Sequence, residues 1–225
     1  MLDSDIRYPS IEHKNYLEEV YEYCKRNNFS MLLKGSLSNN TSTKYSDIDL
    51  VLLGIDINEK IDDLIAIHGK PVMTNFTTNP KGIIILIYED GLCIDMDIRE
   101  TISHEELKES KVLLEVNEKF IISNENITRS EITSTLLPNR PMWYKILRLV
   151  HRGTIKYVSN KPKSALNLLS EIKKNIYVLG IYDLQLEDNF EDDIQIIFSE
   201  ICNKFKVDID IQYMFQNLFK EFKNH

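Results

Sequence analysis

The sequence predicts an α+β protein in which a mixed β-sheet with flanking helices is followed by a helical bundle. Two observations lead to this fold class. Short apolar runs that are typical of strands occur only before the sequence "PNRP" (138–141), and after it the apolar residues follow only a helical period. The chain has 225 residues, of which 43% are hydrophobic and 28% charged, which is an ordinary balance with ample length for a core. We therefore expect two domains, at residues 1–125 and 126–225.

The first half of the chain alternates between helix and strand signals. Apolar residues such as Leu17 and Val20 recur with a helical period over residues 11–27, and Ser10 is placed to cap this helix. The elements expected after it are strands at 29–34, 47–53, 71–77, 82–88 and 92–98, a polar loop at 35–46 and a helix at 58–69. The last two strands are separated by "EDG", which is typical of a hairpin.

Helices are expected at the end of the first half and throughout the second half. The sequences "SHEE" (103–106) and "TRSE" (128–131) have the spacing of a capping box, and each predicts the start of a helix. The helices expected after "PNRP" are at 142–159, 163–179, 189–206 and 208–223. No apolar run reaches the length of a transmembrane helix, and the acidic, polar N-terminus is unlike a signal peptide.

The cysteines and histidines indicate a cytoplasmic protein without a zinc site. The three cysteines lie far apart and show no C-x-x-C spacing, which is typical of reduced thiols in the cytoplasm. The five histidines show no ligand spacing with cysteine or with one another, so we do not expect zinc. The sequence leaves the oligomeric state open.

Charge is distributed unevenly along the chain, whose formal net charge is −8. Residues 1–125 contain 13 Lys and Arg against 23 Asp and Glu, a net charge of −10, whereas residues 126–225 contain 14 against 12, a net charge of +2. Within the second part, residues 129–163 hold eight basic residues and one acid. This asymmetry indicates two substructures that face one ligand with different roles.

The most informative stretch is "LKGSLSNNTSTKYSDIDLVLL" (33–53). Asp47 and Asp49 are two residues apart in a predicted strand, so they lie on the same face and repel each other unless a cation lies between them. Gly35 and Ser36 follow the preceding strand at a tight turn. Glycine lets a phosphate approach the backbone, and the serine hydroxyl and exposed N–H groups can bind its oxygens.

A later strand supplies further carboxylates. In "CIDMDIR" (93–99), Asp95 and Asp97 share one face, and either can complete a carboxylate site with Asp47 and Asp49. Carboxylates and phosphate oxygens are the ligands that Mg²⁺ prefers, with waters completing its octahedron. Two such ions about 3.5–4 Å apart activate an attacking hydroxyl and stabilise a leaving pyrophosphate. The sequence therefore predicts a site for Mg²⁺, with two ions expected.

Taken together, these motifs resemble the nucleotidyltransferase superfamily related to DNA polymerase β. The family signature is a strand, a Gly-Ser turn, a spacer, D-h-[DE] with h apolar, and a third acid on a following strand. Gly35, Ser36, Asp47 and Asp49 match it residue by residue, and "CIDM" matches the usual x-h-D-h around the third acid, which favours Asp95. The resemblance covers residues 29–99. It implies a nucleotidyltransferase-type catalytic domain, a nucleoside triphosphate (NTP) such as ATP as co-substrate, and Asp47, Asp49 and Asp95 as catalytic metal ligands.

The predicted helix at 142–159 adds a feature that the signature lacks. Lys145, Arg148, Arg152 and Lys156 are spaced three, four and four residues apart and form a basic stripe, in a helix that contains no acid. Basic side chains on helices after the catalytic sheet commonly bind the triphosphate in this superfamily. The alternatives are contact with RNA phosphates or an ordinary solvated face.

Three functions follow from these features. The leading prediction is a Mg²⁺-dependent nucleotidyltransferase that moves a nucleoside monophosphate from an NTP to a hydroxyl group of a small molecule. The helical second half resembles the branch of the family that modifies aminoglycoside and lincosamide antibiotics. The second prediction keeps the chemistry but transfers to a macromolecule, either a tRNA end or a protein side chain as in toxin-like members. The third is a non-catalytic nucleotide-binding regulator. The acidic total charge mildly disfavours extended binding to nucleic acid.

Overall fold

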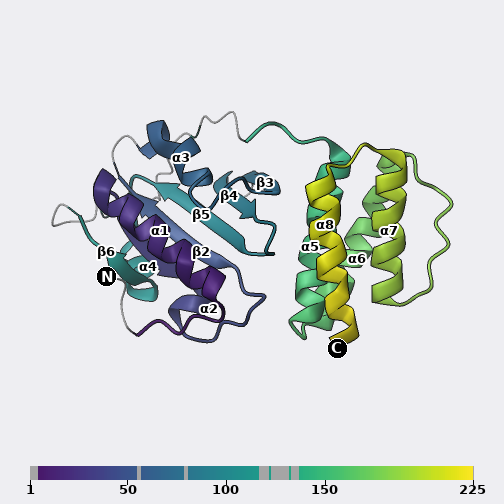
Figure 1. Ribbon diagram of the computed structural model, residues 1–225, viewed down its shortest axis with the longest axis horizontal. Helices are drawn as coiled ribbons and strands as arrows, with labels where there is room; N and C mark the ends of the chain where they lie inside the picture. Colours follow the sequence, from purple (N-terminus) through teal and green to yellow (C-terminus); the bar gives the residue numbers. More distant parts are fainter. Residues whose placement is uncertain are drawn as a thin grey trace. The chain divides into compact units, whose positions relative to one another are not determined.

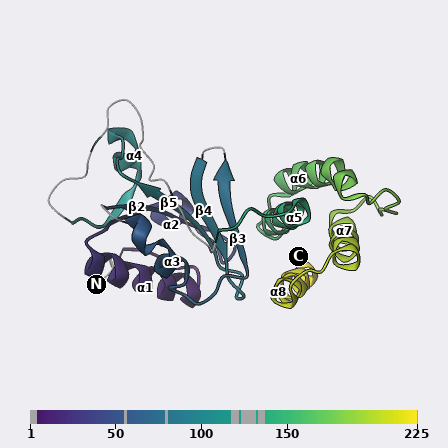
Figure 2. The ribbon, with the colours of Figure 1, turned by 90° about the horizontal axis from the view of Figure 1, so that it is seen from above.

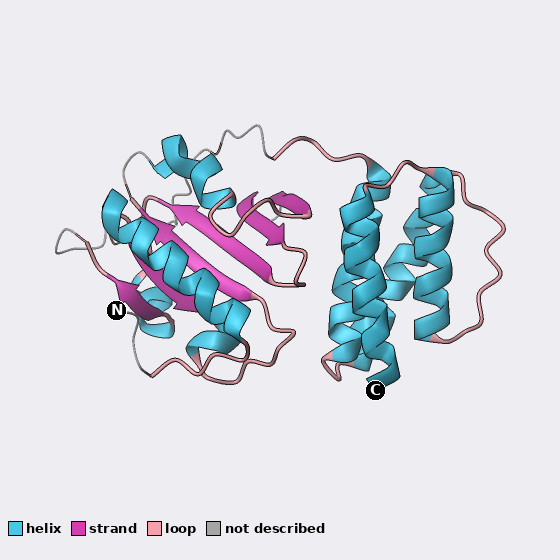
Figure 3. Cartoon of the chain, in the orientation of Figure 1, coloured by secondary structure: helices cyan, strands magenta, loops and turns pink. Residues whose placement is uncertain are grey.

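The computed structural model of the chain consists of two compact units. It describes residues 5–54, 57–78, 81–116, 122, 132 and 137–224. The first unit spans Met1–Pro138 and the second Asn139–His225 (Figure 1). The predicted domain boundary at 125/126 and the predicted capping box at 128–131 lie outside the described residues. In the part that is described, the α+β class is confirmed, with a mixed sheet in the first unit and only helices in the second (Figure 3).

The first unit is built on a six-stranded sheet, counted over the described residues. Its strands are β1 (Ser30–Lys34), β2 (Ile48–Leu53), β3 (Met73–Thr78), β4 (Lys81–Ile87), β5 (Cys93–Arg99) and β6 (Lys111–Leu114). They are ordered β3-β4-β5-β2-β1-β6. β2 and β5 run parallel, and the other neighbours are antiparallel. The parallel pair brings together two strands that lie far apart in sequence, and both begin at the same edge of the sheet.

Two of the helices in the first unit differ from the predictions, one because a loop was expected there and one because it is shorter than expected. The helices are α1 (Ile11–Asn27), α2 (Gly35–Ser38), α3 (Ile61–Ile65) and α4 (His104–Glu109), with a 3₁₀ turn at Ile57–Lys60. α1 begins at its predicted cap, because Ser10 accepts a hydrogen bond from the backbone N–H of His13. The predicted loop at 35–46 instead opens with the helical turn α2. The predicted helix at 58–69 is shorter, because the chain turns at Ala66–Gly69, where the Gly69 N–H donates to the Ala66 carbonyl.

The sheet carries apolar residues on both faces. On one face α1 and α3 pack over the sheet, and Leu17 and Leu64 join Leu50 and Met96 in the main core. On the other face α4 covers a smaller cluster of Leu32, Val51, Leu53 and Ile102 (Figure 2). Since side chains alternate along a strand, Asp49, Asp95 and Asp97 lie on this second face.

The second unit is formed by four helices in the described residues. They are α5 (Met142–Val158), α6 (Pro162–Asn175), α7 (Phe190–Lys204) and α8 (Ile209–Lys220), with 3₁₀ turns at Ile176–Leu179 and Glu221–Asn224. Each presents buried apolar residues, such as Leu147, Ile172, Ile197 and Phe215. Among the described residues, no helix is both long enough and apolar enough to cross a membrane.

Candidate metal centre

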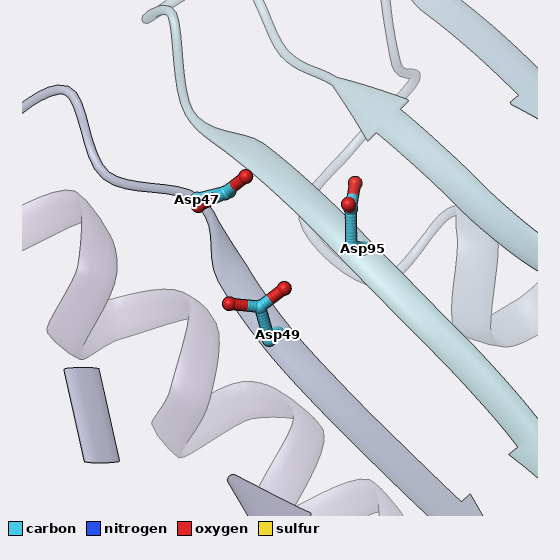
Figure 4. A group of neighbouring side chains, drawn as sticks. All are labelled: Asp47, Asp49 and Asp95. Carbon is cyan, nitrogen blue, oxygen red and sulfur yellow. The ribbon is translucent and has the colours of Figure 1, made fainter. Parts of the chain in front are cut away.

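Three acidic side chains converge near the N-terminal ends of β2 and β5, two neighbouring inner strands of the sheet in the first unit. One carboxylate oxygen from each of Asp47, Asp49 and Asp95 lies within 4.8 Å of the other two, and all three residues are half-buried. Asp49 lies on β2, Asp95 on β5, and Asp47 on the loop that leads into β2 (Figure 4). The group therefore combines residues from two strands and one loop.

The β-ladder explains why the two strand residues meet. Asp49 and Asp95 are directly opposed in the parallel β2–β5 pair, with their side chains on the same face. Lys34 is opposed to Asp49 on the other side, in the antiparallel β1–β2 pair. The apolar residues between the acids, such as Ile48, are fully buried on the α1 side and fix the register, because a slip by one residue would bury the carboxylates.

Gly35 lies directly against this group. Its φ of +67° is a left-handed conformation that favours glycine, and a Cβ built there would lie 2.0 Å from Oδ2 of Asp49. The absence of a side chain therefore leaves room for the Asp49 carboxylate. Ser36 follows in α2, where its carbonyl accepts hydrogen bonds from the backbone N–H (2.9 Å) and the hydroxyl (3.3 Å) of Thr41.

The fourth predicted carboxylate, Asp97, has a different environment. It is buried, and its Oδ2 accepts a hydrogen bond of 2.6 Å from Arg99, which is itself only 3% exposed. Arg99 also donates to Glu106 on α4 (2.5 Å), and Glu106 accepts from Lys34 (2.9 Å). Asp97 does not belong to the group formed by Asp47, Asp49 and Asp95.

Burial and ion pairing oppose each other in this network. Burial alone would raise the pKa of Glu106 and lower that of Arg99. The hydrogen bonds that Glu106 accepts from Arg99 and Lys34 outweigh burial and lower the pKa of Glu106, and those that Arg99 donates to Asp97 and Glu106 raise the pKa of Arg99. The sequence did not predict this network, because Glu106 was assigned only to a capping box. Its N–H does donate to the Ser103 hydroxyl in that way.

The predicted basic stripe lies on α5 of the second unit. Lys145 and Arg152 are exposed, whereas Arg148 and Lys156 are half-buried. His151 lies between Arg148 and Arg152 in the sequence of α5 and is buried. Burial, and to a smaller extent the charge of Arg148, lowers the pKa of His151 to about 3. His151 is therefore neutral at pH 7, and the positive charge of this helix comes from its lysines and arginines.

The carboxylate group has the chemistry of a site for a hard divalent cation. Two oxygens on one Mg²⁺ lie about 2.9 to 4.2 Å apart, because the ion binds oxygens at about 2.0–2.1 Å in an octahedron. Oxygens already within 4.8 Å of one another need only small side-chain rotations to reach these separations. All three donors are carboxylates, which suit Mg²⁺, Ca²⁺ and Mn²⁺ better than softer metals. The residues therefore fit the predicted ion.

No protein-family model matches this chain, and no curated protein matches it either. Conclusions about its function therefore depend on the site itself.

Proposed function

We propose that this protein is a Mg²⁺-dependent nucleotidyltransferase of the DNA polymerase β-like type. It transfers a nucleoside monophosphate from an NTP to a hydroxyl group, most simply that of a small molecule. The observation that carries this proposal is the convergence of Asp47, Asp49 and Asp95 beside the glycine of a strand–Gly–Ser turn. A carboxylate triad alone is common on protein surfaces. A triad that abuts the glycine of a strand–Gly–Ser turn suits the joint binding of a cation and a phosphate group.

In this proposal the three carboxylates hold the metal and orient it toward the triphosphate. When bound, Mg²⁺ neutralises charge on the phosphates and lowers the pKa of a coordinated hydroxyl. The ladder between β2 and β5 keeps Asp49 and Asp95 at a fixed separation, so that little reorganisation is needed when the ligand binds. The absence of a side chain at Gly35 leaves room for the Asp49 carboxylate, and Ser36 is the candidate for contact with a phosphate oxygen.

Asp95, rather than Asp97, is proposed as the third ligand. The Asp97 carboxylate is engaged by Arg99, so its charge is already compensated within the protein. Asp97 instead anchors Arg99, which links β5 to Glu106 on α4. Through Arg99, Asp97 thus helps to hold α4 on the face of the sheet on which Asp95 lies.

The basic stripe of Lys145, Arg148, Arg152 and Lys156 is the candidate for binding the triphosphate. This role is supported by the positive charge of α5, because the helix contains no acidic residue that would offset the charge of its lysines and arginines. Contact with an RNA backbone is the alternative role, and it would favour a macromolecular acceptor. The proposal includes a cytoplasmic location, which is supported by three cysteines that form no disulfide with one another.

The proposal is tested by following the α-phosphate of labelled NTPs. The protein is incubated with Mg²⁺, each of the four α-labelled NTPs, and a panel of small hydroxyl compounds, bulk tRNA or protein. We expect label on a small-molecule acceptor with release of pyrophosphate, and no label with Asp49→Asn. Label on tRNA or protein would favour the macromolecular alternative. Binding of the NTP without any transfer would favour a regulator, and absence of both binding and transfer would overturn the proposal.

A further inference from the structure

We propose that His13, near the start of α1, is a positioning residue that holds the Asp47 carboxylate in place for metal binding. The inference rests on the proposed function, because it requires Asp47 to bind a cation together with Asp49 and Asp95. It concerns a residue that contacts neither the metal nor a substrate, and whose effect passes through the backbone of Ser46.

Asp47 is supported differently from the other two acids. Asp49 and Asp95 lie inside β2 and β5, and each has a paired strand on both sides. Asp47 precedes the first residue of β2, so the backbone of its loop determines where its carboxylate points (Figure 4). A metal ligand on a loop needs an additional anchor if it is to stay within about 0.5 Å of a productive geometry.

His13 provides such an anchor at the residue before Asp47. Its Nε2 lies 2.9 Å from the carbonyl oxygen of Ser46, and because a carbonyl only accepts, Nε2 carries a proton and donates it. Its Nδ1 lies 2.8 Å from the hydroxyl of Ser10, the N-cap of α1. The side chain is only 2% exposed, so water competes poorly for these bonds. The ring thus ties the rigid start of α1 to the end of the loop.

Hydrogen bonds within the loop further fix Ser46, the residue that is covalently joined to Asp47. The N–H of Ser46 donates to the carbonyl of Thr43 (2.9 Å), and the N–H of Thr43 donates to the hydroxyl of Ser46 (3.0 Å), which closes a small turn. Farther back, Asn40 is bonded to the segment just before α1. The loop is therefore held at two points, and the His13 bond is the one adjacent to Asp47.

The test uses two substitutions of similar length, of which only one offers an N–H donor. His13→Gln keeps an N–H donor near the position of Nε2, whereas His13→Met fills the same buried space without one. Mn²⁺ replaces Mg²⁺ as the probe, and its free concentration is followed by electron paramagnetic resonance during titration. Loss of a partner that orients a metal ligand typically costs about ten- to hundredfold in affinity. We expect this loss in His13→Met, and we expect His13→Gln to stay within about threefold of the parent, well below that range.

Tyr88→Phe is the matched control. It also removes a buried donor from a ring to a backbone carbonyl in the first unit, since the Tyr88 hydroxyl donates to the Ile65 carbonyl (3.0 Å), but that bond does not involve the loop. We expect it to lower the melting temperature without changing the affinity for Mn²⁺. The inference is overturned if His13→Met binds Mn²⁺ like the parent, if His13→Gln is as weak as His13→Met, or if Tyr88→Phe is weakened equally.

A failure of the proposed function gives a different result. In that case the parent itself would not bind Mn²⁺, or would bind it no better than Asp49→Asn does. If the parent binds and Asp49→Asn does not, the metal site stands, and the comparison of His13→Met with His13→Gln then decides the inference alone.

Discussion

Substitution of Gly35 by alanine tests whether the carboxylate group needs a residue without a side chain at position 35 in order to bind a metal. An added Cβ would lie 2.0 Å from Asp49 Oδ2, whereas ordinary van der Waals contacts begin at 3.4 Å, so the carboxylate must move by more than an ångström. The left-handed φ adds a backbone cost of about 1–2 kcal/mol for a residue with a Cβ. Since about 1 kcal/mol corresponds to 2–4 °C in a chain of this size, the melting temperature should fall by roughly 2–8 °C.

Gly91→Ala separates the backbone cost from the displacement of Asp49. Gly91 also has a positive φ, of +85°, but nothing lies within 4 Å of a Cβ built there. Both variants should therefore lose thermal stability through the backbone, and Gly35→Ala should lose at least as much as Gly91→Ala, because it also displaces Asp49. Only Gly35→Ala should also lose affinity for Mn²⁺, by about ten- to hundredfold, because only there is a ligand displaced. Isothermal titration with Mn²⁺ and thermal denaturation measure the two effects. Equal Mn²⁺ affinities in Gly35→Ala and Gly91→Ala would refute the reasoning.

Four further substitutions test the third metal ligand, the basic stripe and the buried histidine of α5. Asp95→Asn should abolish Mn²⁺ binding and leave the melting temperature unchanged or higher. Asp97→Asn should keep Mn²⁺ binding and destabilise the fold by up to about 3 kcal/mol, because buried Arg99 keeps Glu106 but loses the second of its two carboxylate partners. Titration with Mn²⁺ and thermal denaturation distinguish the two variants. Arg152→Ala should weaken NTP binding by about 1.5–3 kcal/mol, roughly ten- to hundredfold, in a fluorescence titration; weaker binding of bulk tRNA instead would indicate an RNA contact. Burial lowers the pKa of His151 to about 3, against 6.5 in the unfolded chain, so its contribution to stability is present above pH 6.5 and is lost as the pH falls toward 3. His151→Leu should therefore flatten the dependence of the melting temperature on pH in this range. An unchanged slope would contradict this expectation.

The sequence predicted the elements that depend on local patterns. Helix α1 was predicted with its Ser10 cap, and the alternation of apolar and acidic residues predicted the two strands that carry Asp49 and Asp95. The four residues of β6 were missed, because so short a run has no clear period, and its pairing with β1 is a long-range contact. The spacing of residues in the sequence does not indicate which distant segments will pair.

The same limit applies to the surroundings of the site. The bond between His13 and the Ser46 carbonyl joins residues 33 positions apart, and that between Lys34 and Glu106 joins residues 72 positions apart. A buried histidine on an apolar helix face and a glutamate in a capping box both have ordinary structural explanations. Only the fold shows that His13 reaches the loop that carries Asp47, and that Glu106 is bonded to Arg99 on β5, the strand that carries Asp95.

The central claim is that the three carboxylates bind a metal that also binds a nucleoside triphosphate. It is tested most directly by the melting temperature of the parent and of Asp49→Asn with saturating Mg²⁺, with each of the four NTPs, and with both together. A ligand that binds only the folded state stabilises it by RT ln(1 + [L]/Kd), which is about 2.7 kcal/mol at a hundredfold excess over Kd. We predict that Mg²⁺ and at least one NTP together stabilise the parent more than the sum of their separate effects, and that Asp49→Asn loses this synergy. A parent whose melting temperature does not respond to any Mg²⁺–NTP pair would contradict the claim.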